Sequence, residues 1–139
     1  MPANTSPIFA LTSNTPTGLT ILTANTAKDG TGAVVTSLTG GANGTLVKGI
    51  TFRGIGTNTA TVARIFINNG LTNATPANNS LFGEITLPAT TLSETGALAT
   101  QVWMPDVPNF VLPTGYKLNV TIGTTVAAGY AIQAIGGDY

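Results

Sequence analysis

Apolar and polar side chains alternate without a break in Tyr116-Lys117-Leu118-Asn119-Val120-Thr121-Ile122. Successive side chains of a β-strand point to opposite faces, so this segment predicts a strand with one buried face and one solvated face. Seven other segments are rich in Thr, Val, Ile and aromatic residues and are separated by Gly- and Asn-rich turns. They are Gly18–Thr23, Ala33–Thr39, Leu46–Ile55, Thr61–Asn68, Leu81–Leu87, Ala97–Met104 and Tyr130–Ile135. Apolar residues nowhere repeat at helical spacing over several turns, so we expect very little helix.

Short strands separated by turns of this kind predict an all-β fold, an antiparallel β-sandwich with the eight strands of a jelly roll. The connection at Gly56–Ala60 leaves one alternative open. If it is a hairpin, Arg53 and Arg64 lie diagonally on one sheet. If it crosses between sheets, as a jelly roll requires, the two arginines lie on different sheets.

The chain has 139 residues and fits one domain of common size. Residues 1–16 contain three prolines and many small polar side chains. We therefore expect an N-terminal arm at 1–16, followed by a single β-sandwich domain at 17–139. Within the arm, Ile8, Phe9 and Leu11 form a short apolar anchor, and arms of this kind become ordered on contact with a partner.

Charged residues make up only 7% of the chain, against about 25% in an ordinary soluble domain, and the net charge is zero. Because no basic stripe can form, we expect no nucleic-acid partner. Weak electrostatic repulsion between copies favours association. No apolar run approaches the ~20 residues that cross a bilayer, so we expect no membrane span. Met1–Ser6 lacks a basic segment followed by an apolar one, so a secretory signal is not indicated.

Histidine and cysteine are both absent. This excludes a Ser-His-Asp triad, a Cys-His pair and metal sites built from imidazole or thiolate. An enzymatic hypothesis would need the only two glutamates, Glu84 and Glu94, to converge on a cleft as a glycosidase pair. The alternative pairs Glu84 with Arg64 or Arg53 and leaves Glu94 in solvent. We favour the alternative and predict no enzyme and no cofactor.

Trp103 is the only tryptophan. It could be a half-buried core residue, an interface anchor or a platform on which a sugar stacks. A carbohydrate-binding hypothesis would place Trp103 or Tyr116 on an exposed concave face beside the amide of Asn119.

The segment Thr61–Asn68 carries apolar residues on both of its faces, which is typical of a strand covered on two sides. If one face turns toward the core, Phe66 lies on the other, and Phe82 similarly opposes the core face of its own strand. Clustered exposed apolar surface marks association sites, so the pattern predicts a subunit interface. Its residues would be Val62, Arg64, Phe66, Phe82 and Glu84. The competing hypothesis is that the long polar loop Asn69–Ser80 folds back over the sheet.

Several segments resemble recurring segments of small tailed-phage virion proteins. They are Thr57-Asn58-Thr59-Ala60-Thr61-Val62-Ala63-Arg64-Ile65-Phe66-Ile67-Asn68-Asn69-Gly70, Glu84-Ile85-Thr86-Leu87-Pro88-Ala89-Thr90-Thr91-Leu92-Ser93-Glu94, Leu112-Pro113-Thr114-Gly115-Tyr116-Lys117-Leu118-Asn119-Val120 and Gly136-Gly137-Asp138-Tyr139. The resemblance covers roughly residues 44–139.

The resemblance implies a capsid-associated structural protein of the virion, such as a decoration (cement) protein. Proteins of that kind are often trimeric β-sandwiches at capsid three-fold positions. The implied partners are two further copies, in a homotrimer, and the major capsid protein, and the implied location is the capsid surface. A head-fibre, tail-fibre or carbohydrate-binding module for host attachment is the alternative.

Overall fold

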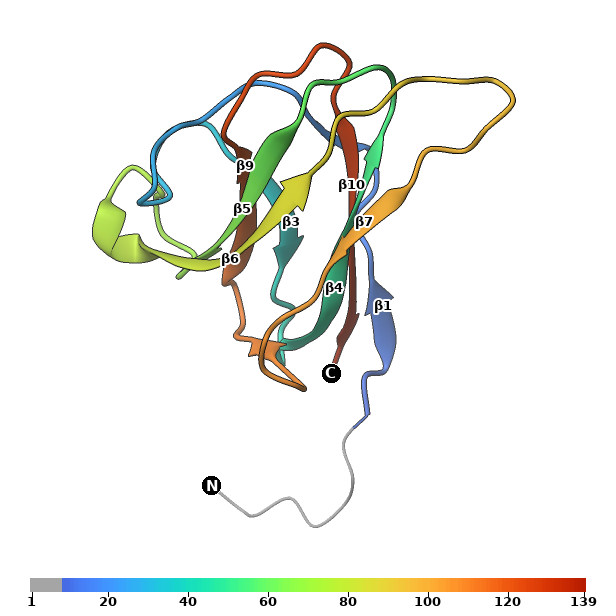
Figure 1. Cartoon of the computed structure of the whole chain (residues 1–139). Coiled ribbons are helices and arrows are strands. Elements are labelled where there is room, and N and C mark those ends of the chain that lie inside the picture. Colours follow the sequence, from blue (N-terminus) through green and yellow to red (C-terminus); the bar gives the residue numbers. More distant parts are fainter. Residues whose placement is uncertain (1–8) are drawn as a thin grey trace, which may run out of the picture.

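The computed structural model describes residues 9–139, which form ten strands in two antiparallel sheets packed face to face (Figure 1). The strands are β1 Thr12–Asn14, β2 Leu19–Ile21, β3 Val35–Thr39, β4 Thr45–Gly54, β5 Thr61–Asn68, β6 Asn79–Leu87, β7 Thr100–Trp103, β8 Val111–Leu112, β9 Lys117–Ile122 and β10 Tyr130–Asp138. One short 3-10 turn, Pro76–Asn78, precedes β6. Among these residues no helix is long and apolar enough to span a bilayer.

The first sheet is centred on β10 and β4, with β1 and β2 paired to β10 and with β7 and β8 paired to β4. The second sheet has the order β3-β9-β5-β6. Each of the eight predicted segments overlaps a strand, although β4, β6 and β10 extend beyond the predicted bounds. The strand order is consistent with the expected jelly roll. The connection between β4 and β5 crosses from one sheet to the other, so Arg53 and Arg64 lie on different sheets.

The core fills the space between the sheets because alternate residues of the central strands point inward. Ile50 and Phe52 of β4 meet Leu118, Val120 and Ile122 of β9, and all five are fully buried. Burying such side chains stabilises the fold by about 1.5–3 kcal/mol each. The prediction that residues 116–122 form a strand with a buried apolar face is therefore confirmed.

The prediction that the other face of β9 is solvated is wrong. Asn119 is only 2% exposed and Thr121 is fully buried, although both point away from the core. Strand β9 has a neighbour on each side, β3 and β5, and its outer face is covered by other parts of the chain. Alternation identified the strand correctly, but it could not show that both faces are buried.

The predicted arm contains a strand. Residues 12–14 form β1, which pairs with the end of β10, and the amide of Leu11 donates to the carbonyl of Asp138 at 2.7 Å. Phe9 and Leu11 are 74% and 84% exposed, so neither packs into the sandwich. Ile8, the third predicted anchor residue, lies outside the described residues. The engagement of a partner by the arm stays a prediction.

Candidate functional site

The outer face of the second sheet is covered at one end by two loops of the chain itself. Phe66 points outward from β5, yet it is fully buried. The two loops, residues 22–34 and 69–78, are tied together where the side-chain amide of Asn73 donates to the carbonyls of Gly30 at 3.2 Å and Gly32 at 2.7 Å. They lie beside one another next to the second sheet (Figure 1). Phe66 is therefore not a surface residue, and its predicted exposure at an interface is wrong.

Phe82 also differs from the prediction, because a β-bulge reverses the alternation in β6. Ile65 of β5 pairs with Gly83, but the next residue, Phe66, pairs with Leu81, so Phe82 is the extra residue. A bulge re-aims side chains in this way. Phe82 turns toward the core, where its ring lies 5.5 Å from that of Trp103 and 4.7 Å from that of Phe110. The predicted outward position of Phe82 is wrong as well.

Trp103 belongs to the core and is only 7% exposed. Its indole packs against the backbone at Gly83, where β6 and β7 close one side of the sandwich. Asn119 is buried and accepts a hydrogen bond from the hydroxyl of Thr36 at 2.8 Å. Trp103 and Asn119 therefore do not form the exposed sugar platform that the carbohydrate hypothesis placed there.

Arg64 and Glu84 are directly opposite one another on β5 and β6, and Arg64 Nε lies 2.9 Å from Glu84 Oε1. The pairing of Glu84 with an arginine is thus confirmed for Arg64. Glu94 is exposed in the connection between β6 and β7, which extends away from the sandwich (Figure 1). Glu84 contacts a cation rather than a second carboxylate, and within residues 9–139 no cluster of three acidic side chains could hold a metal.

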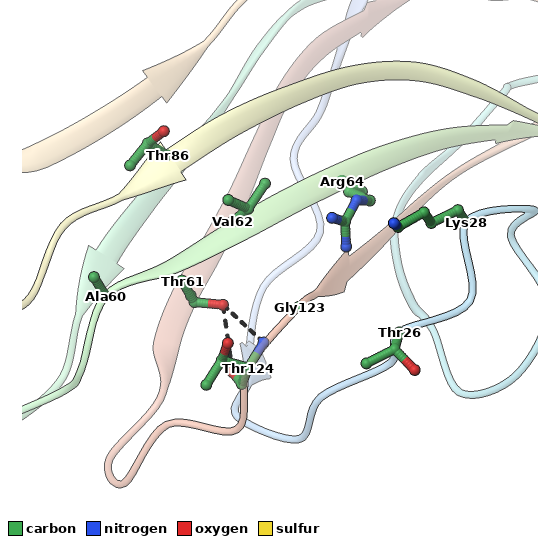
Figure 2. A pocket seen from close by; sticks show the side chains of 9 residues that line it. All are labelled: Thr26, Lys28, Ala60, Thr61, Val62, Arg64, Thr86, Gly123 and Thr124. Atoms are coloured by element: carbon green, nitrogen blue, oxygen red, sulfur yellow. Dashed lines mark hydrogen bonds between the residues drawn. The ribbon is translucent and has the colours of Figure 1, made fainter.

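A groove of about 530 Å³ remains on the outer face of the second sheet, beyond the part that the loops cover (Figure 2). Arg64 contributes to it from β5 and Lys28 from the connection between β2 and β3. The other lining residues are small or carry hydroxyls: Thr26, Ala60, Thr61, Val62, Thr86, Gly123 and Thr124. Of the predicted interface residues, the groove brings together Val62 and Arg64.

The outer face of the first sheet carries apolar side chains that are exposed within residues 9–139. Val102 of β7 lies beside Thr51 of β4. Both point away from the core, because Trp103 follows Val102 and is buried, and Ile50 and Phe52 on either side of Thr51 are buried. Met104 and Ile135 extend this surface, and the exposed fractions of Val102, Met104 and Ile135 are 52%, 65% and 43%. We refer to these three residues as the apolar face of the first sheet.

No known relative helps to assign either surface. No family model matches the chain, and neither a curated protein nor a solved structure is significantly similar to it. The assignment therefore rests on the chemistry of the two surfaces and on the resemblance described from the sequence.

Sequence reasoning missed Lys28 and the apolar face. The apolar face could have been predicted from the sequence, because Val102 and Met104 alternate with Trp103, and Ile135 alternates with buried residues of β10. No sequence pattern indicated Lys28, because only the folded loop places it beside Arg64.

Proposed function

We propose that this chain is a non-enzymatic structural protein of a phage virion, a decoration protein that docks on the major capsid protein. The observation that carries this proposal is the contrast between the two outer faces. The chain covers one end of its second sheet with its own loops, but it leaves large apolar side chains exposed on its first sheet. Exposed apolar surface of this kind marks sites of association.

Further observations support the proposal. The chain has no histidine or cysteine, its net charge is zero, and its segments resemble those of small virion proteins. The exposed Phe9 and Leu11 suit contact with a neighbouring copy, as expected for a homotrimer. The apolar face would then be free to contact the capsid.

The first test is location. We expect the chain in particles purified from its source, on the outside of the head, as detected by mass spectrometry and by antibody labelling in electron micrographs. Purified particles that lack the chain would contradict the virion role.

The second test is a pair of charged substitutions, Val102→Asp and Ile135→Asp, measured by co-sedimentation with undecorated capsids. An unpaired charge at the centre of an interface weakens binding about tenfold or more. Leu92→Asp is the matched control, because Leu92 is 53% exposed but lies in the β6–β7 connection. All three variants should fold. Equal binding by wild type, Val102→Asp and Ile135→Asp would show that the apolar face is not the docking surface.

A further inference from the structure

Among the described residues, the groove on the second sheet is lined by two cationic groups, Lys28 and Arg64, and by no carboxylate. Asp29, the residue after Lys28, accepts hydrogen bonds from the amide and hydroxyl of Thr31. Figure 2 shows the ammonium of Lys28 directed toward Arg64, and both side chains line the groove. Glu84 pairs with Arg64, whereas no carboxylate of residues 9–139 pairs with Lys28. The groove therefore keeps one uncompensated positive charge, which a ligand with one negative charge would balance.

Arg64 also has unused hydrogen-bond donors. Its Nε donates to Glu84, but within the described part of the chain neither Nη atom donates to any acceptor. The side chain is 16% exposed, and neither Nη atom is among the buried side-chain atoms that lack a partner, so both are open to solvent or to a ligand. The planar fork of a guanidinium matches the two oxygens of a carboxylate.

Gly123 keeps this part of the groove open. A β-carbon at Gly123 would lie 3.3 Å from Arg64 Nη1. Glu84 contacts a different atom of the same guanidinium, Nε. The φ angle of Gly123 is not in the left-handed region, so the backbone does not itself require glycine. The missing side chain thus leaves space beside the free donors of Arg64.

The rest of the groove is lined by hydroxyls. Thr61 Oγ1 is occupied, because it accepts a hydrogen bond from the amide of Thr124 at 3.0 Å. Thr26 and Thr86 are exposed, and their hydroxyls make no hydrogen bond within residues 9–139. A groove with one free positive charge and several free hydroxyls suits a ligand that carries both an acid and hydroxyl groups. Its volume also lies in the range of small-ligand sites, about 300–1,000 Å³.

We infer that this groove binds a carboxylate-bearing sugar. The carboxylate lies between Arg64 and Lys28, and the sugar hydroxyls face Thr26 and Thr86. An acidic peptide fits less well, because extended peptides add to a free strand edge. The edge strand here is β6, whereas Arg64 lies one strand further in, on β5, which is hydrogen-bonded on both sides. The inference is independent of the proposed capsid docking, which uses the opposite sheet.

The test is a titration of the ¹⁵N-labelled full chain with sodium glucuronate, followed by amide chemical shifts. We expect saturable shifts at Gly123, Thr124 and Thr26, and none with glucose, which lacks the carboxylate. Lys28→Gln should weaken binding about tenfold, because it removes one charge-assisted contact from an exposed position without disturbing the fold. Gly123→Val should weaken it by obstructing Arg64. Lys48→Gln is the matched control, because Lys48 is an exposed lysine on the first sheet.

Three results would overturn the inference. The first is the absence of saturable shifts with glucuronate. The second is equal binding of sodium acetate, which would identify a site for a bare anion. The third is tighter binding of a Glu-containing peptide than of glucuronate, which would identify a protein ligand. None of these outcomes depends on capsid binding.

Discussion

The indole nitrogen of Trp103 occupies the space in which a side chain at Gly83 would begin, so the two residues fit only as a pair. Trp103 belongs to the first sheet and Gly83 to the edge strand of the second. Their contact, together with Phe82 and Phe110, fills the side of the sandwich where β6 faces β7.

Gly83→Ala should therefore destabilise the protein. The new β-carbon would lie 2.8 Å from Trp103 Cε2 and 2.9 Å from Cζ2, and the ring cannot move without disturbing Phe82. Overpacking of this kind costs about 1–3 kcal/mol. The measurement is the free energy of unfolding in urea.

Gly96→Ala is the control for the effect of alanine itself. Gly96 is exposed, and the atom nearest to a β-carbon added there is the Ser93 hydroxyl oxygen, at 3.8 Å. We expect a change within about 0.5 kcal/mol. Similar losses in both variants would show that the Trp103 contact is not responsible. Trp103→Phe should restore part of the stability of Gly83→Ala, because it removes the atoms that collide.

Alternation, together with strand-forming composition between turn signals, was enough to predict eight of the ten strands. It failed at Phe82 for a reason that is not local. The bulge depends on how β6 pairs with β5, and a one-residue shift moves every later side chain to the other face. The short strands β1 and β8 carried no detectable pattern, because two or three residues cannot show a period.

The candidate sites were harder to predict than the strands. Phe66 has the sequence pattern of an exposed residue, and only the fold shows that loops bury it. Lys28 and Arg64 are far apart in the chain and meet because a loop crosses the second sheet. The apolar face could have been predicted from the alternation of Val102 and Met104 with Trp103.

Phe66→Asp should prevent folding rather than release a folded monomer. The carboxylate would be placed at a fully buried position without a cationic partner, and this costs several kcal/mol. Phe66→Ala should cost about 3–5 kcal/mol. Circular dichroism and size-exclusion chromatography provide the readout. A folded, soluble Phe66→Asp monomer would restore the hypothesis that Phe66 lies at a subunit interface.

Asn58 ties its own loop to the β9–β10 connection from a buried position. Its amide donates to the carbonyl of Gly129 at 2.9 Å, and its oxygen accepts from the amides of Ala128 at 2.9 Å and Gly129 at 2.8 Å. Asn58→Ala leaves the amides of Ala128 and Gly129 unpaired at a cost of about 1–3 kcal/mol each, so the unfolding midpoint in urea should fall sharply. The Gly129 carbonyl keeps its hydrogen bond from the Ile55 amide at 3.1 Å. Asn43→Ala removes an exposed hydrogen bond to Tyr139 and should have little effect. Equal effects in the two variants would contradict the role of Asn58.

Tyr130 makes stability depend on pH in the alkaline range. Burial raises the pKa of its phenol above the ordinary value of 10.0, because the ionised form is poorly solvated there. The unfolded chain therefore releases this proton at lower pH than the folded chain does. The contribution of Tyr130 to the unfolding free energy is complete below pH 10 and is lost as pH rises through the folded-state pKa.

The hydroxyl of Tyr130 also donates to the carbonyl of Pro88 at 3.0 Å. Tyr130→Phe should lose about 0.5–1.5 kcal/mol at neutral pH, yet its unfolding free energy should fall less steeply above pH 10. Parallel alkaline curves for the two proteins would show that Tyr130 is not the responsible group.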